Sequence, residues 1–177
     1  MTLTPILTVS LVLLGCILVT VPIMMYNRLV RLKNRIEKAW ANIDVLLKQR
    51  HDELPNIIAV VKGYAAYERK LQTAIAHART AYAGAASMSS KAAASSEVSA
   101  VFTTFLGIAE NYPKLAANEH YLALQKRISE LENNIAERRT FYNESVTVYN
   151  TRIEEVPYNI FAKLFGYTRK DLFSFQE

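Results

Sequence analysis

Residues 3–25 read LTPILTVSLVLLGCILVTVPIMM, an almost continuous apolar run, and no side chain from Thr2 to Asn27 is charged. A helix rises about 1.5 Å per residue, so about 20 residues are needed to cross the ~30 Å hydrocarbon layer of a bilayer. Pro5 and Pro22 lie near the ends of the run, where a lost backbone hydrogen bond costs least. The run predicts a transmembrane anchor over residues 1–27.

Two other interpretations of this run exist. A cleaved secretory signal begins with a basic region and has a shorter apolar core, but residues 1–8 contain no Lys or Arg. The stretch Leu13-Leu14-Gly15-Cys16 resembles a bacterial lipobox, whose cysteine is acylated after cleavage. After Cys16, however, the apolar run continues to residue 25, whereas a mature lipoprotein would usually turn polar after its cysteine. A membrane span is the better interpretation, and processing at Cys16 is the alternative.

Basic residues follow the run directly. They are opposed only by Glu37, and the preceding residues carry no basic side chain. The basic cluster consists of Arg28, Arg31, Lys33, Arg35 and Lys38. Because translocating such a cluster is unfavourable, the positive-inside rule predicts a single-pass protein of the inner membrane with Met1 outside and the rest of the chain in the cytoplasm.

The charge balance argues against nucleic acid as a partner. The formal net charge is +5, from 21 basic and 16 acidic residues. Residues 28–38 hold a net +4, so the other segments together are nearly neutral. A basic cluster beside a membrane attracts anionic lipid, whereas a nucleic-acid binder is expected to have a basic face on its folded domain.

Four later segments have apolar residues at helical spacings of three and four. They cover residues 29–50, 57–82, 98–112 and 121–156. Only five glycines and five prolines punctuate the chain, which favours long helices. The predicted fold is therefore all-α: the N-terminal transmembrane helix is followed by an antiparallel four-helix bundle over residues 28–177, with a short aromatic C-terminal element.

Local signals predict how these helices begin and end. Asp52 or Glu53 is expected to cap the second helix before Pro55, and Asn118 to cap the fourth. Asn159 is expected to cap a short helix over residues 160–165, with Gly166 at its C-terminus. The small residues 83–96 predict a mobile loop, although their alanines could extend either neighbouring helix.

The order of these segments closely resembles the LemA family of bacterial membrane proteins. The resemblance covers nearly the whole chain. Glu53 departs from it, because the family usually has an apolar residue at that position before the proline. Among the matching motifs are Tyr26-Asn27-Arg28-Leu29-Val30, Ala39-Trp40, Val61-Lys62-Gly63-Tyr64-Ala65, Glu110-Asn111-Tyr112-Pro113 and Phe165-Gly166. The resemblance implies a helical bundle on a membrane anchor, in a family without an established catalytic activity.

The sequence offers no catalytic machinery. The histidines His51, His77 and His120 have neither the spacing of a helical zinc site nor an HExxH motif. The Glu-x-x-His pattern of diiron bundles is missing as well, since Glu68 is followed three residues later by Leu71. We therefore predict no catalytic, cofactor-binding or metal-binding residues, and no enzyme.

Several polar residues interrupt the apolar stripes. They are Arg50, Glu68, Glu132, Arg139, Asn143 and Asn150. A charge inside a bundle must be paired or solvated, because stranding it costs about several kcal/mol. We predict a structural polar network in the bundle interior, and a binding site is the alternative.

The last predicted surface joins the membrane exit and the tail. In an antiparallel bundle the fourth helix returns to the membrane, so the aromatic and basic tail is expected near the emerging first helix. The alternative is that its rings only close the end of the core. The predicted membrane or partner contacts are Tyr26, Arg28, Arg31, Lys33, Phe161, Phe165, Phe173 and Phe175.

These features predict a non-catalytic scaffold or adaptor whose bundle contacts other membrane or cytoplasmic proteins near the lipid bilayer. A self-assembling, homo-oligomeric membrane organiser is the alternative, and an unrecognised enzyme is a third possibility. Exposed apolar surface on the folded domain would favour the first two. A deep pocket with converging ionisable groups would favour the third.

Overall fold

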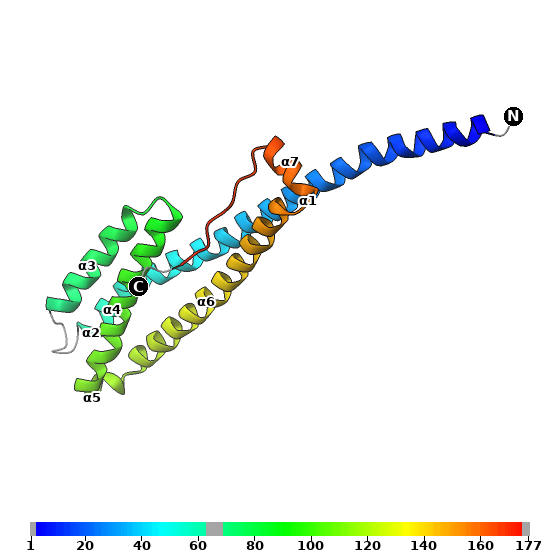
Figure 1. Cartoon of the computed structure of the whole chain (residues 1–177). Helices are drawn as coiled ribbons and strands as arrows, with labels where there is room; N and C mark the ends of the chain where they lie inside the picture. The colour runs from blue at the N-terminus through cyan, green and yellow to red at the C-terminus, as the bar shows by residue number, and fades with distance from the viewer. Residues whose placement is uncertain (1–2, 63–68, 175–177) are drawn as a thin grey trace. The chain divides into compact units, whose positions relative to one another are not determined.

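The computed structural model describes residues 3–62 and 69–174 (Figure 1). All regular elements in these residues are helices, so the all-α prediction is confirmed. The helices are α1 Leu3–Asp52, α2 Leu54–Val61, α3 Arg69–Ala83, α4 Met88–Asn111, α5 Pro113–Ala116, α6 Glu119–Glu154 and α7 Tyr158–Leu164.

The chain divides into two compact units. The anchor unit comprises Met1–Lys38 and Glu144–Leu172, and the core unit comprises Ala39–Asn143 with Phe173–Glu177. The long helices α1 and α6 each supply residues to both units. The predicted boundary between residues 27 and 28 marks the expected end of the membrane span. It is therefore a different boundary from the one between the two compact units.

The core unit contains a large cluster of buried apolar side chains. On α3 the residues Leu71, Ile75 and Ala78 recur at spacings of four and three, which places them on one face of the helix. On α4 this face meets a matching stripe that includes Phe102 and Phe105, both almost fully buried. Helices α3 and α4 lie side by side and are joined by a short turn (Figure 1).

Helix α4 is much longer than the sequence predicted. Ser87 caps it: the backbone N of Ser90 donates to Ser87 Oγ at 3.1 Å, and the backbone N of Ser87 donates to Ser90 Oγ at 2.9 Å. The loop predicted over residues 83–96 is therefore wrong for most of its length. Its alanines instead extend the following helix, and Ala92 and Ala94 are buried.

The boundary after α1 falls at the predicted place, but its cap differs. Glu53 occupies the N-cap position of α2, and its side chain makes no capping hydrogen bond. Its carboxylate is used elsewhere, as described below. The second predicted helix is represented by α2 and α3, and residues 63–68 between them, which include Glu68, lie outside the described residues.

Asn118 caps α6 as predicted. Its Oδ1 accepts hydrogen bonds from the backbone N of His120 at 2.9 Å and of Tyr121 at 3.1 Å. The predicted cap at Asn159 is wrong, because α7 already begins at Tyr158, after Pro157.

The predicted role of Gly166 is confirmed. Its φ of +68° lies in the left-handed region that glycine tolerates best. The backbone N of Tyr167 donates to the carbonyl of Ala162 at 2.9 Å, the hydrogen bond that defines a Schellman C-terminus.

Among the described residues, α1 and α4 are long and apolar enough to cross a membrane by length and composition. They differ in burial. Half of the apolar window in α4 is buried, as in the core helix of a soluble domain. The window in α1 has no buried residue.

Candidate functional site

The first part of α1 exposes a continuous apolar surface in the anchor unit. Leu11 is 72 % exposed, Leu18 65 % and Met24 68 %, and the neighbouring large apolar side chains are similarly exposed. Monomeric soluble proteins rarely leave a patch of this kind in water. The predicted anchor is therefore a helix that is capable of spanning a membrane.

Packing begins where this surface ends. Met25 is the first buried side chain among those described on α1, which begin at Leu7, and Leu29 is fully buried. The ring of Tyr26 lies 5.1 Å from the ring of Phe165, between centroids, so the end of α7 packs beside the start of the basic cluster. Within the anchor unit, the structure thus brings together two of the predicted contact residues.

The other predicted contact residues of the anchor unit have varied environments. Arg28 and Arg31 are exposed, and Lys33 is exposed within 3.8 Å of Glu37. The side chain of Phe161 is partly buried.

The tail residue Phe173 is in the protein interior of the core unit rather than on its surface. It is 2 % exposed, and its ring centroid lies 5.6 Å from that of Trp40. The backbone N of Phe173 donates to Asn143 Oδ1 at 2.8 Å, and Asn143 Nδ2 donates to the Phe173 carbonyl at 3.1 Å. Phe175 lies outside the described residues.

Asn150 holds the preceding part of the tail in the same way, within the anchor unit. The backbone N of Lys170 donates to Asn150 Oδ1 at 2.9 Å, and Asn150 Nδ2 donates to the Lys170 carbonyl at 2.9 Å. The Tyr149 hydroxyl donates to the carbonyl of Thr168 at 3.0 Å. The two asparagines therefore bind the backbone of the tail, a role that their spacing on α6 did not reveal.

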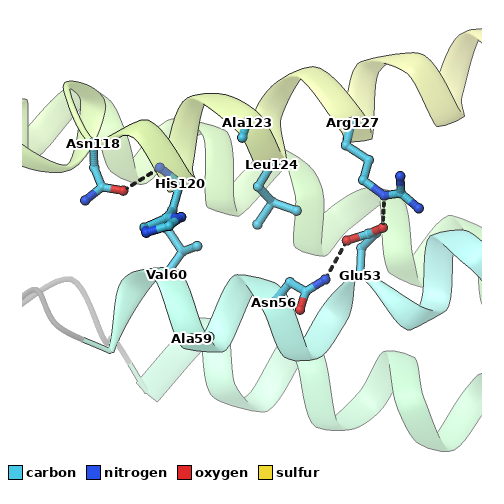
Figure 2. A pocket seen from close by; sticks show the side chains of 9 residues that line it. All are labelled: Glu53, Asn56, Ala59, Val60, Asn118, His120, Ala123, Leu124 and Arg127. Carbon is cyan, nitrogen blue, oxygen red and sulfur yellow. Dashed lines mark hydrogen bonds and ion pairs between the residues drawn. The ribbon is translucent and has the colours of Figure 1, made fainter.

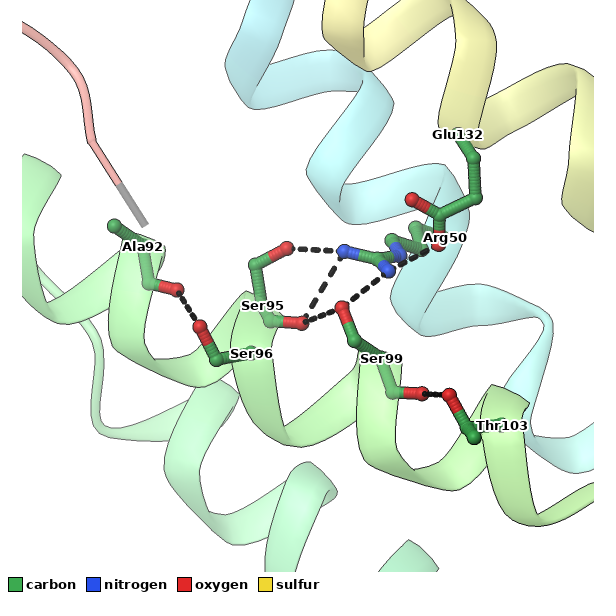
Figure 3. Close-up of polar contacts among 7 residues, drawn as sticks. All are labelled: Arg50, Ala92, Ser95, Ser96, Ser99, Thr103 and Glu132. Carbon is green, nitrogen blue, oxygen red and sulfur yellow. Dashed lines mark hydrogen bonds and ion pairs between the residues drawn. The ribbon is translucent and has the colours of Figure 1, made fainter. Parts of the chain in front are cut away.

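Arg50 is the centre of a buried polar network in the core unit (Figure 3). It is 1 % exposed, and its guanidinium donates to Ser95, to Ser99 Oγ at 2.7 Å and to the carboxylate of Glu132. Burial lowers the pKa of Arg50, and the charge of Glu132 acts in the opposite direction. The ring of Phe102 completes the surroundings, 5.2 Å from Arg50 Cζ.

The remaining members of the predicted network lie in different environments. The side chain of Glu132 is 43 % exposed, so the carboxylate that pairs with Arg50 also meets solvent. Arg139 is partly exposed, and Glu68 lies outside the described residues. The serines that receive Arg50 were not predicted, because Ser95 belongs to the stretch predicted to be a loop and neither serine carries an apolar signal.

A groove lies between α2 and the start of α6 in the core unit (Figure 2). Its volume is about 630 Å³, and Val60 and Leu124 point into the space between the two helices. Glu53, which is 5 % exposed, pairs at one end with Arg127 and accepts a hydrogen bond from Asn56 Nδ2 at 2.7 Å. The lining residues are Glu53, Asn56, Ala59, Val60, Asn118, His120, Ala123, Leu124 and Arg127.

The charged groups of this groove are engaged with one another. Glu53 and Arg127 form an ion pair, which raises the pKa of Arg127. In the groove and in the rest of the described chain, no three His, Cys, Asp or Glu side chains are grouped so that they could hold a metal ion. The groove thus has an apolar middle, with the Glu53–Arg127 pair at one end and Asn118 and His120 at the other.

The fold and these surfaces define a class of protein: an all-α domain that follows a long helix with an exposed apolar segment. The model of the LemA family matches residues 39–177, and the chain belongs to the LemA family. A comparison with curated proteins gave no match.

Proposed function

We propose that this protein is a membrane-anchored scaffold or adaptor of the bacterial inner membrane, without a catalytic activity of its own. The observation that carries the proposal is the exposed apolar surface of α1, which extends from Leu7 to Met24. A bilayer is the environment in which such a surface costs least. Membership in the LemA family agrees with this proposal.

The proposed topology places the N-terminus outside and residues 39–177 in the cytoplasm. Its support is the basic cluster Arg28–Lys38, which directly follows the apolar segment. Protease added to sealed spheroplasts is expected to leave the domain intact, and protease added after lysis is expected to digest it. Digestion in the sealed spheroplasts would contradict the topology.

The proposed scaffold role rests on the groove between α2 and α6. An apolar middle between two polar ends suits contact with an amphipathic helix of a partner. The ion pair of Glu53 and Arg127 neutralises the carboxylate and the guanidinium of the groove. Other membrane or cytoplasmic proteins are therefore the proposed partners of this surface.

Photo-crosslinking in intact membranes tests this role. A photoreactive amino acid replaces Ala123, which lines the groove, and Gln125 serves as the control, because it is exposed two residues further along α6. We expect a heteromeric adduct from position 123 that position 125 does not give. An adduct of twice the chain's mass would favour self-assembly instead, and no specific adduct at position 123 would contradict the scaffold role.

A further inference from the structure

Four large apolar side chains are exposed in and around α7. Val156 is 79 % exposed, Ile160 63 %, Leu164 74 % and Phe165 52 %. Ile160 and Leu164 are four residues apart within α7, so they share one face of that helix. We call these four residues the α7 patch.

The α7 patch is fixed in place within the anchor unit. Ala162 is buried on the opposite side of α7, and the Schellman turn at Gly166 ends the helix. After the turn, Asn150 binds the backbone of Lys170 through two hydrogen bonds. The exposed side chains of α7 are therefore presented by an ordered corner of the chain.

The contact between Phe165 and Tyr26 determines where the end of α7 lies along α1. The rings of Tyr26 and Phe165 are 5.1 Å apart, and Tyr26 follows directly after the exposed apolar segment. If α1 spans the bilayer, Tyr26 lies at the boundary between acyl chains and headgroups. Phe165 then lies at the same depth, because the two rings are in contact.

We propose that the α7 patch enters this boundary, so that the bilayer contacts the protein at a second point besides α1. The inference rests on the proposed anchoring by α1, with which the patch is continuous through Tyr26 and Phe165. Tyr and Trp rings are enriched at this depth, as expected of Tyr26. Apolar side chains of an interfacial helix are buried about 5–10 Å into the headgroup and acyl boundary.

The charges nearby agree with a lipid surface. Lys163 is exposed between Ile160 and Leu164 in sequence, and Arg28 and Arg31 are exposed on the turns of α1 that follow Tyr26. Cations at the end of an apolar segment can reach anionic headgroups while the apolar side chains remain in the acyl region. A partner's apolar groove would cover the four side chains but gives no reason for the contact of Phe165 with Tyr26.

Depth measurement with spin labels tests the inference on the full chain. Cys16 is the only cysteine, so Cys16→Ser gives a background for single labels. Nitroxides are attached after Leu164→Cys in the α7 patch, Leu14→Cys in the apolar segment of α1, and Leu122→Cys, a position on α6 in the core unit that is 49 % exposed. Each protein is placed in vesicles of neutral and anionic phospholipid.

Accessibility to oxygen, which partitions into the bilayer, is compared with accessibility to a water-soluble nickel chelate. We expect the ratio to favour oxygen strongly at position 14, moderately at position 164, and not at position 122. A probe at 164 that behaves like the probe at 122, while 14 remains in the bilayer, would overturn the inference and leave the anchor proposal intact. Shielding of 164 from both reagents would overturn it in favour of a protein contact. Nickel access at position 14 would overturn the anchor and the inference together.

Discussion

Asn143 and Phe173 exchange two hydrogen bonds, from the backbone N of Phe173 to Asn143 Oδ1 at 2.8 Å and from Asn143 Nδ2 to the Phe173 carbonyl at 3.1 Å. A primary amide has one donor side and one acceptor side, so it pairs with a peptide unit as a neighbouring strand would. The pairing fixes the backbone of Phe173 while its ring packs on Trp40. A side chain of α6 and Trp40 of α1 therefore both contribute to the position of this tail residue.

Asn143→Ala is expected to release Phe173 from Trp40. Two lost hydrogen bonds at about 0.5–1.5 kcal/mol each predict a destabilisation of about 1–3 kcal/mol. Trp40 is the only tryptophan, so the fluorescence reports on it alone. Its emission is expected to shift to longer wavelength, because water takes the place of the Phe173 ring beside the indole. Asn134→Ala, at an exposed position on the same helix, is the control. Unchanged emission in Asn143→Ala would show that apolar contact alone holds the tail.

Glu132→Gln tests the charge pairing of Arg50. The substitution leaves a guanidinium that is 1 % exposed without its counter-charge. Leaving a buried charge unpaired costs about 3–5 kcal/mol, and because Glu132 is partly solvated we expect about 1–3 kcal/mol. Chemical denaturation gives the value. The control is Glu130→Gln, which removes an exposed pair with Lys126 at 3.9 Å and is expected to cost no more than about 0.5 kcal/mol. Equal effects would mean that the serines alone satisfy Arg50.

Arg50→Ala and Arg139→Ala are expected to differ for the same reason. The sequence placed both residues on apolar stripes, but Arg50 is buried and Arg139 is partly exposed. Arg50→Ala leaves the partly solvated carboxylate of Glu132 and two serines without their donor, and we expect it to destabilise the core unit by about 1–3 kcal/mol. Arg139→Ala is expected to cost less. A larger loss for Arg139→Ala in thermal unfolding would contradict this order.

Ser87→Ala tests the start of α4. The substitution removes the acceptor of the Ser90 backbone N, and loss of an N-cap costs about 0.5–2 kcal/mol. Helix content and the melting temperature are expected to fall, because buried Ala92 follows within the next turn of α4. The control is Ser89→Ala, at an exposed position whose hydroxyl contacts the Ser87 hydroxyl at 3.0 Å rather than a backbone N–H. A loss that is equal in both variants would show that the capping box is not needed.

The sequence predicted the helices where apolar spacing and strong boundary residues coincide. Pro55 lies in the first turn of α2, Pro113 lies just beyond the end of α4 at Asn111, and Asn118 caps α6 as expected. The start of α4 was missed because alanine and serine carry little apolar signal. Its Ser87–Ser90 capping box also lacks the Glu or Gln that usually reveals this motif.

The candidate site was predicted less well, because its partners are distant in sequence. Arg50 could be seen as a charge on an apolar stripe, but its pairing with Ser95 and Ser99 depends on how α4 packs. Glu53 looked like a helix cap, whereas its carboxylate reaches Arg127, 74 residues away. Exposed Ile160 and Leu164 were not recognised either, since a short helix has too few residues to show which face is buried.

Tyr149 makes the stability of the fold sensitive to alkaline pH. Its side chain is 1 % exposed, and burial, followed by the charge of Tyr167, raises its pKa above the ordinary value of 10.0. Between the unfolded and the folded pKa of Tyr149, the folded state binds more protons than the unfolded state. The stabilisation from this group is therefore complete below about pH 10 and is lost as pH rises through the raised pKa. Tyr149→Phe is expected to cost about 1 kcal/mol at pH 8, through the lost hydrogen bond to Thr168, and to make the decline above pH 10 shallower. Denaturation at pH 8 to 11 measures both effects. The other titrating groups are common to the wild type and the variant, so they cancel in the comparison. Parallel profiles of unfolding free energy against pH would show that the Tyr149 phenol has the same pKa in the folded and unfolded states.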